Sequence, residues 1–415
     1  MGISGDIING IRNRLFPTRP SGVNPEIAVV HPDLMRKGGA EAVCMNILEA
    51  LQYTYDVTLL TLVHPKLDEL NEFYGTSVDQ ISVEQFEPTA VSLLQWLSKP
   101  LRFDLKLDGL QWALLDRHAR NVQDTYDLVI STRDEISFRN RALQYIHMPT
   151  RAAIIENGRQ SLPGYAGHTS LIYRLYDIVR FRLAGYEPDL VKKDRLLTNS
   201  EWTAGMIEQV YGADSKVIYP PIDKREFSSI DWGRRETGFV MIGRLSPEKR
   251  VLEALEIIDA LHDFDADIHI HVVGSAVNPE YAAEVERMAS TRKYVHLEGE
   301  CSRERLVELI QRHRYGLHSK KFEHFGMTVA EFAVGGAIPF VHNSGGQTDI
   351  VLDDDRLTYD DAEAAIRKAK TVIGNEGLQQ EITNMLSDST DRFSKQTFQQ
   401  RLREVVINEL EHTNE

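Results

Sequence analysis

The sequence predicts an α/β protein built from two doubly wound domains. From about Glu26 onward, short apolar runs alternate with helix-length amphipathic stretches, an alternation typical of parallel βαβ units. A length of 415 residues accommodates two sizeable domains. With 42% hydrophobic and 26% charged residues, the composition is that of a chain that buries a core.

The first half of the chain holds six candidate strands, each a short apolar run. They are Ile27 to Val30, Val57 to Leu60, Leu128 to Ser131, Leu143 to His147, Leu196 to Asn199 and Val217 to Tyr219. An amphipathic helix is expected after Gly39, because four apolar residues fall on one helix face there: Val43, Ile47, Leu48 and Leu51.

The second half repeats the pattern with five candidate strands. They are Phe239 to Ile242, Ile268 to Val273, Val295 to Leu297, Gly316 to His318 and Ile338 to Val341. Segments with helical spacing, such as Leu252 to Leu261 and Leu306 to Ile310, separate them. The boundary between the halves is expected in Tyr219 to Asp223 and the polar stretch that follows, because the paired prolines Pro220 and Pro221 end a strand and stiffen a connection.

Charge and cysteine content narrow the function classes. The net charge of −15 argues against binding to the phosphates of nucleic acid as the main activity. Two isolated cysteines, Cys44 and Cys301, exclude a disulfide framework and a CxxC pair and fit a reducing cytoplasm. No run of about 18 apolar residues and no signal-peptide core is found, so any membrane contact is expected to be peripheral.

The first candidate ligand site is the turn Lys37 to Glu41, between a strand and a helix. Gly38 and Gly39 allow backbone amides to approach an anion, and a helix N-terminus favours negative charge. A flexible turn without a ligand remains an alternative. The turn is not G-x-G-x-x-G, and neither that fingerprint nor a Walker A loop occurs in the chain, so an NAD-dependent oxidoreductase loses its main support.

The second candidate is the loop Gly243 to Arg250, directly after the first strand of the second half. Arg244 and Lys249 are expected at the carboxyl end of the sheet, where open α/β domains bind ligands. Two cations suit a diphosphate without a metal ion. A solvated basic loop is the alternative.

The third candidate is the segment from Glu323 to Glu331, with two carboxylates across the expected start of a helix. Eight residue steps of about 1.5 Å span roughly 12 Å along a helix axis, so the two carboxylates could contact the sugar and the ribose of a nucleotide sugar. The amides near Phe325, Gly326 and Met327 are expected to face the anion between them. Glu331 lies among apolar residues, where a charge without a function is costly.

Together, the GGAE turn, the GRLSPEK loop and the E-x7-E segment resemble the retaining glycosyltransferases of family 4, which have the GT-B fold. The likeness covers about Ile27 to Ile350. Four fragments are most similar to the mannosyltransferases that extend dolichol-linked oligosaccharides: Tyr145 to Pro149, Asn199 to Thr203, Tyr219 to Pro221, and Glu323 to Gly326 continuing through His342 to Gly346.

The resemblance implies two Rossmann-like domains that face a cleft. It implies an N-terminal segment over residues 1–23, an acceptor-binding domain over 24–223, a nucleotide-sugar-binding domain over 224–390 and a helix over 391–415 that packs back on the first domain. Phe393 to Leu410 has the apolar spacing of that helix.

The resemblance also implies roles for individual residues. Gly39 contacts the donor diphosphate, Arg244 and Lys249 neutralise it, Glu323 holds the transferred sugar and Glu331 binds the ribose. His147 contacts the donor sugar or the acceptor hydroxyl, although a histidine with a purely structural role in the core remains an alternative. The implied donor is GDP-mannose and the implied acceptor a lipid-linked glycan, with no metal ion and no other cofactor.

Three stretches mix apolar and basic residues in a way suited to a bilayer surface: Ile7 to Arg19, Leu93 to Phe103 and Leu171 to Leu183. They predict a peripheral enzyme on the cytosolic face of a membrane, while core helices remain an alternative for each. The acidic run Asp353 to Asp355 is expected to be a solvated turn. Two other functions stay open, namely a catalytically silent nucleotide-sugar sensor or scaffold, and a transferase that uses a UDP-sugar and another acceptor.

Overall fold

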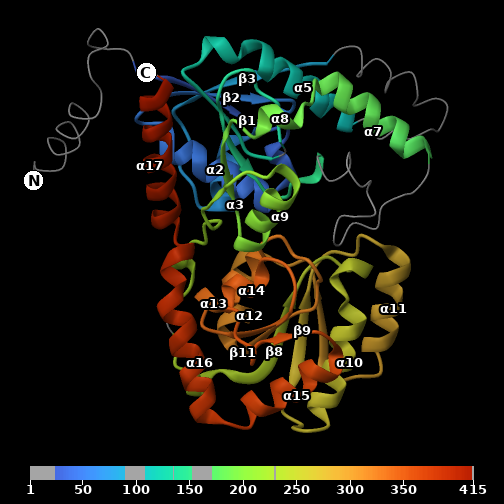
Figure 1. Ribbon diagram of the computed structural model, residues 1–415. Coiled ribbons are helices and arrows are strands. Elements are labelled where there is room, and N and C mark those ends of the chain that lie inside the picture. Colours follow the sequence, from blue (N-terminus) through green and yellow to red (C-terminus); the bar gives the residue numbers. More distant parts are fainter. Residues whose placement is uncertain (1–23, 89–107, 134, 152–170, 229, 414–415) are drawn as a thin grey trace, which may run out of the picture.

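The computed structural model describes residues 24–88, 108–133, 135–151, 171–228 and 230–413 (Figure 1). These residues form two α/β domains stacked end to end, and the last two long helices run along one side of both (Figure 1). Each domain contains one parallel sheet with helices on both faces. The predicted fold class is therefore confirmed.

Within the described residues, the first sheet has seven parallel strands in the order β3-β2-β1-β4-β5-β6-β7. Their bounds are β1 (Glu26–Val30), β2 (Asp56–Thr61), β3 (Ile81–Gln85), β4 (Leu128–Ser131), β5 (Leu143–Ile146), β6 (Arg195–Thr198) and β7 (Lys216–Val217). All six predicted strands are present. The edge strand β3 was missed because it is only half-buried and carries polar residues at alternate positions.

The helices of the first domain include one that is almost entirely buried, α2, with ten of its 13 residues inaccessible. The bounds are α2 (Gly39–Leu51), α3 (Leu67–Tyr74), α5 (Asp108–Val122), α7 (Leu171–Ala184), α8 (Pro188–Val191) and α9 (Glu201–Tyr211). Helix α9 has both signals of a well-defined helix: Ser200 accepts a hydrogen bond from the Thr203 amide at its start, and Gly212 adopts a left-handed conformation at its end.

The described residues also form a second sheet of six parallel strands in the order β10-β9-β8-β11-β12-β13. Its strands are β8 (Glu236–Ile242), β9 (His269–Val273), β10 (Val295–Gly299), β11 (His313–His318), β12 (Ile338–His342) and β13 (Thr358–Tyr359). Its helices are α10 (Val251–His262), α11 (Pro279–Ala289), α12 (Arg303–Arg312), α13 (Met327–Val334), α14 (Gln347–Ile350), α15 (Ala362–Ile373) and α16 (Glu376–Ser389). All five predicted strands are present, and only the two-residue β13 was missed.

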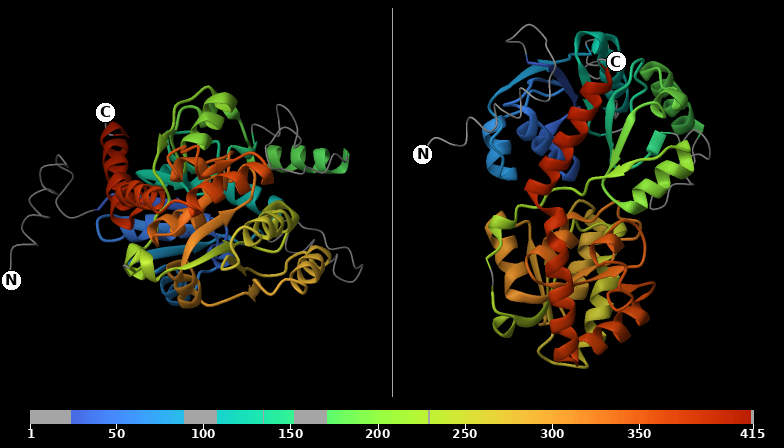
Figure 2. Two further views of the ribbon diagram at one scale, coloured as in Figure 1. Left: turned by 90° about the horizontal axis from the view of Figure 1, so that it is seen from below. Right: turned by 60° about the vertical axis from the view of Figure 1, so that its left-hand side comes forward.

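The last helix, α17 (Lys395–Thr413), returns to the first domain, as the sequence predicted (Figure 2). Its apolar face joins the core formed by β1 and α2, through Phe398, Leu402, Val405, Val406 and Leu410. Polar contacts fix the same packing, because Lys395 Nζ lies 2.6 Å from Glu49 Oε2 and Arg403 donates to the Ala50 carbonyl. Helix α17 therefore ties the end of the chain to the first domain.

We expect Leu402→Ala to lower the free energy of unfolding by about 2–5 kcal/mol. The leucine is fully buried, so truncating it loses the transfer free energy of the removed atoms and creates a cavity. Urea unfolding measures the change. The control is Glu404→Ala on the exposed side of the same helix, which should shift stability by less than about 0.5 kcal/mol. Equal effects of the two substitutions would contradict the packing described for α17.

Among the described residues, no helix has the length and apolar character needed to span a bilayer. Two of the three predicted membrane-surface stretches, Ile7 to Arg19 and Leu93 to Phe103, lie outside the described residues. The third corresponds to α7.

Candidate active site

The carboxyl ends of both parallel sheets face the junction between the two domains (Figure 1). Contacts cross this junction: Ser200 Oγ donates to the His324 carbonyl at 2.6 Å, and the rings of Trp202 and His324 stack. The starts of α2 and α13 also approach each other, since a Cβ placed on Gly39 would lie 3.4 Å from Met327 Cγ. Two helix N-termini, both favourable to anions, therefore lie close together here.

Glu323 is the centre of a charged cluster at this junction. Lys249 Nζ lies 2.9 Å from its Oε2 and Lys320 Nζ lies 2.9 Å from its Oε1. His318 Nε2 lies 3.4 Å from Oε2. Burial alone would raise the pKa of Glu323, but the charge of Lys249 and the contact with His318 hold that pKa well below its usual range. Glu323 is thus an ionised carboxylate between two ammonium groups.

The two carboxylates lie on either side of the start of a helix, as predicted, but the structure corrects the helical spacing expected between them. Helix α13 begins at Met327, after Gly326 with a φ of 101°, so Glu323 lies in the preceding loop. That loop is held by a bridge to the segment after β12, where the Gly346 amide donates to the Glu323 carbonyl at 2.7 Å. The 12 Å helical spacing expected between the two carboxylates therefore does not apply.

Of the two predicted cations, only Lys249 joins the cluster. Lys249 ends a short 3₁₀ helix, Pro247–Lys249, and its side chain is 17% exposed. Arg244 is 61% exposed and pairs with Glu248 at 3.3 Å, its neighbour four residues along. Lys249 therefore forms an ion pair with Glu323, whereas Arg244 extends into solvent at the same edge of the sheet.

Glu331 lies on α13 with its side chain 11% exposed, and its partner is Arg303 of α12. Arg303 Nη1 lies 2.5 Å from Glu331 Oε1, and the same guanidinium contacts Glu226 at 2.6 Å. Burial raises the pKa of Glu331, and the Arg303 charge acts against that rise. The Glu331 carboxylate, which the sequence places among apolar residues, is therefore paired with a guanidinium.

In the first domain, the Gly38 amide is already used. It donates to Glu41 Oε2 at 2.9 Å, which closes a capping box at the start of α2. Burial alone would raise the pKa of Glu41, but its contacts with His31 and Arg133 lower it to about 2. The expected anion contact of this turn thus rests on the amide of Gly39, in the first turn of the helix.

His147 directly follows β5, at the carboxyl edge of the first sheet. Its Nε2 lies 3.1 Å from the Thr132 carbonyl, which only accepts, so Nε2 carries the proton and Nδ1 keeps a lone pair. Burial lowers the pKa of His147 to about 4, so the ring is neutral at pH 7. The residue is partly exposed, and its tautomer is fixed by the backbone.

Sequence reasoning missed His318, Lys320, Arg303 and Arg133. Three of these could have been found, because Arg133 follows β4 by two residues, His318 ends β11 and Lys320 follows it, all at the carboxyl edge where ligands bind. Arg303 gave no local signal, since its contact with Glu331 depends on how α12 and α13 are packed.

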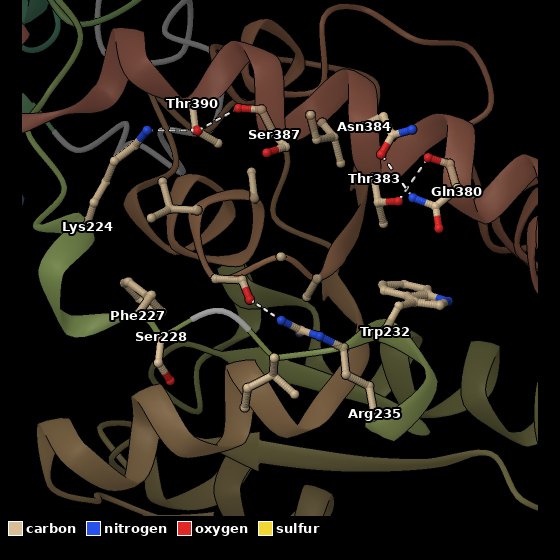
Figure 3. A pocket seen from close by; sticks show the side chains of 17 residues that line it. Lys224, Phe227, Ser228, Trp232, Arg235, Gln380, Thr383, Asn384, Ser387 and Thr390 are labelled. Carbon is tan, nitrogen blue, oxygen red and sulfur yellow. Dashed lines mark hydrogen bonds between the residues drawn. The ribbon is translucent and has the colours of Figure 1, made fainter.

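A separate cavity of about 460 Å³ lies in the second domain (Figure 3). Trp232 and Arg235, which precede β8, line it together with Gly335 and Gly336, which precede β12. It is therefore at the amino-end edge of the sheet, away from Glu323. The buried Arg235 donates to three backbone carbonyls, those of Ile310, His313 and Gly335. These contacts identify Arg235 as a structural cation.

A buried carboxylate also connects the domains. Asp349 of α14 accepts a hydrogen bond from the Glu201 amide, at the start of α9, at 2.7 Å. Burial raises the pKa of Asp349 to about 6; the Glu201 amide and Arg392 oppose the rise, and Asp353 and the Glu201 carboxylate add to it. Because the pKa of Asp349 in the folded state exceeds its unfolded value of 3.8, the free energy of unfolding falls as the pH rises from 3.8 to about 6.

We therefore expect Asp349→Asn to be more stable than the parent chain at pH 7, by up to about 3 kcal/mol at about 1.4 kcal/mol per pKa unit. The asparagine oxygen can still accept from the Glu201 amide but carries no charge. The difference should vanish only below about pH 3, where the aspartate is protonated in both states, because its unfolded-state pKa is 3.8. Urea unfolding at both pH values measures it, and a pH-independent difference would contradict the interpretation.

Comparison with known proteins identifies a family for part of the chain. Residues 223–386 match the family described as glycosyl transferases group 1. A curated relative from Dictyostelium discoideum, a GDP-Man:Man(3)GlcNAc(2)-PP-Dol alpha-1,2-mannosyltransferase, is 25% identical over 226 residues, 49% of this chain and 45% of the relative. The human protein of the same name is 25% identical over 177 residues, 38% of this chain and 36% of the relative. The matched segments thus span less than half of these curated relatives.

Solved structures resemble most of the chain. HepE from Anabaena, solved with UDP and glucose, has a TM-score of 0.64 at 16% identity and covers 92% of this chain and 99% of its own. Sucrose-phosphate synthase from Thermosynechococcus elongatus has a TM-score of 0.66 at 12% identity, with 92% and 98% covered. Residues 223–386 are thus a domain of the glycosyl transferases group 1 family, in a chain that has the two-domain GT-B fold.

Proposed function

We propose that this chain is a retaining, metal-independent glycosyltransferase that moves mannose from GDP-mannose to a lipid-linked glycan. The observation that carries the proposal is the cluster of Lys249, Lys320 and His318 around Glu323, at the carboxyl edge of the second sheet. It lies at the domain junction where the N-termini of α2 and α13 come close together. Cations and the backbone amides of a helix N-terminus both bind phosphate groups favourably, so this combination suits a donor diphosphate.

In the proposed reaction, the bond between the sugar and the diphosphate breaks and its electron pair leaves with the nucleoside diphosphate. Lys249 and the N-terminus of α13 stabilise the negative charge that develops on that phosphate. The acceptor hydroxyl attacks from the face that the phosphate leaves, and its proton passes to the departing phosphate oxygen. Glu323, held ionised by its cations, orients the sugar and forms no covalent bond.

Nucleoside recognition is assigned to Glu331. A ribose offers hydroxyl donors, and an ionised carboxylate accepts them. Arg303 keeps the Glu331 side chain in a fixed position, because it also contacts Glu226. His147, neutral and with a lone pair on Nδ1, is assigned to the sugar or acceptor hydroxyl from the opposite domain.

The choice of donor and acceptor rests on the names of the relatives, which specify GDP-Man and a dolichol-linked glycan. A lipid-linked acceptor requires approach to a membrane, and α7 supports this. Leu175, Ile178 and Val179 are each about half exposed, at 54%, 49% and 55%, and their spacing places them on one helix face. We infer that this face lies against the cytosolic surface of a membrane.

The test is donor-dependent stabilisation of the purified chain, with and without EDTA, followed by transfer of labelled sugar to a lipid-linked glycan. GDP-mannose should raise the thermal midpoint more than UDP-glucose, UDP-N-acetylglucosamine or NAD, because a ligand that binds the native state stabilises it. The Glu331→Ala variant should abolish the rise. A shift with a UDP-sugar alone would reassign the donor, and binding without transfer would favour a nucleotide-sugar sensor.

A further inference from the structure

Three histidines converge in the second domain, away from the candidate active site. His269 and His271 lie two residues apart on β9, and His313 begins β11. Each offers a ring nitrogen, and these nitrogens all lie within 4.8 Å of one another. The three rings pack closely, with centroids 4.6–5.5 Å apart. The group lies at the amino ends of the strands, at the edge of the sheet opposite Glu323.

Hydrogen bonds fix the tautomers of two of these rings. His313 Nδ1 lies 2.7 Å from the Leu309 carbonyl, and His269 Nδ1 lies 2.9 Å from the Asp267 carbonyl. A carbonyl only accepts, so both Nδ1 atoms carry protons and both Nε2 atoms keep their lone pairs when the rings are neutral. Those two Nε2 atoms are 3.1 Å apart. Two lone pairs at that distance repel unless a cation or a proton lies between them.

Carboxylates complete the environment of a metal site. Glu236 Oε2 lies 3.3 Å from His269 Nε2 and 3.6 Å from His313 Nε2, so a third acceptor faces the same point. Glu298 Oε1 lies 2.6 Å from His271 Nδ1, which leaves Nε2 of that ring as its ligand atom. Carboxylates that hold the second nitrogen of a histidine are common around zinc, because they orient the ring and raise its basicity.

The backbone leaves room for this arrangement. Gly238 of β8 pairs with His269 in the sheet, between the two histidine-bearing strands. A Cβ on Gly238 would lie 2.5 Å from His269 Nε2 and 2.8 Å from His313 Cδ2. A side chain at this position would therefore displace both rings from the point where they meet.

We propose that His269, His271 and His313 bind a divalent transition-metal ion of the zinc class through their Nε2 atoms, with Glu236 as the fourth ligand. Ligands about 2.0–2.1 Å from a tetrahedral zinc lie about 3.3 Å apart, close to the separation of His269 and His313. The ring nitrogens that the three histidines offer lie within 4.8 Å of one another, so the largest of these separations must shorten by at most about 1.5 Å. The ion links β9 to β11 across β8 and is structural, so the site goes beyond the proposed sugar transfer and does not take part in it.

The experiment uses the full chain without a histidine tag, stripped of metal by chelation and then titrated with Co²⁺. We expect one Co²⁺ per chain with the visible absorption of a tetrahedral site, displacement by Zn²⁺, and a rise in thermal midpoint with either ion. X-ray absorption of the Zn²⁺-loaded chain should show three imidazole ligands, a readout that needs no variant.

Variants locate the site. His313→Gln and His269→Gln should each weaken Zn²⁺ binding at least about 100-fold, and Gly238→Ala should weaken it without removing a ligand. His262→Gln is the control, a histidine of the same domain outside the group, and should bind as the parent chain does. Failure of the wild-type chain to bind Co²⁺ or Zn²⁺ would overturn the proposal, and so would unchanged binding in both ligand variants. Stabilisation by GDP-mannose should be retained in His269→Gln, so the two proposals fail separately.

Discussion

Replacing Lys249 by alanine should lower turnover by about 10²–10³-fold, the usual loss when one group that stabilises transition-state charge is removed. In the free enzyme Lys249 contacts Glu323, but Lys320 also holds that carboxylate at 2.9 Å. Glu323 therefore keeps a cationic partner in the variant, and the loss should fall on the leaving phosphate. The chain should remain folded, with a thermal midpoint close to that of the parent.

Steady-state kinetics with GDP-mannose measure this effect. Because Lys249 is assigned to charge that develops only as the sugar bond breaks, kcat and kcat/KM should fall together while the donor KM stays nearly constant. Lys293→Ala is the matched control, an exposed lysine at the amino-end edge of the same domain. A variant with full turnover would remove Lys249 from the proposed mechanism.

Most strands of the two sheets could be predicted because they contain a short run of buried apolar residues. β1, β4 and β12 are buried at nearly every position, and such runs are conspicuous in a sequence. The edge strands β3 and β13 are half-buried or two residues long, so neither produces a continuous apolar run. Helix α17 was predictable for a related reason, since its apolar face is buried against α2.

The site was predictable only where it depends on position along a strand. Lys249 was predicted because it follows a strand at the carboxyl edge of its sheet, whereas His147 was predicted from the family resemblance; the structure places both at that edge. The conformation around Glu323 could not be predicted, because it depends on a bridge to Gly345, 22 residues later in the sequence. The pairing of Glu331 with Arg303 could not be predicted either, because it depends on how α12 and α13 pack against each other.

The second large effect is expected for Glu331→Gln, which should raise the donor KM by about 10–100-fold, in line with about 1.5–3 kcal/mol for a hydrogen bond to a charged group. In the proposed complex Glu331 binds the ribose, which is remote from the bond that breaks. Contacts of that kind stabilise the ground state and the transition state alike, so kcat should change little. This pattern is the opposite of that expected for Lys249→Ala.

A matched variant separates recognition from structure, because Arg303 has two carboxylate partners. Glu226→Gln removes the other one, at 2.6 Å, and leaves Glu331 paired. If Glu331 acts on the ribose, only its own substitution raises the donor KM, and Glu226→Gln leaves KM near the parent value. If both variants raise KM equally, the effect comes through the position of Arg303, and the nucleoside contact must be assigned to that guanidinium.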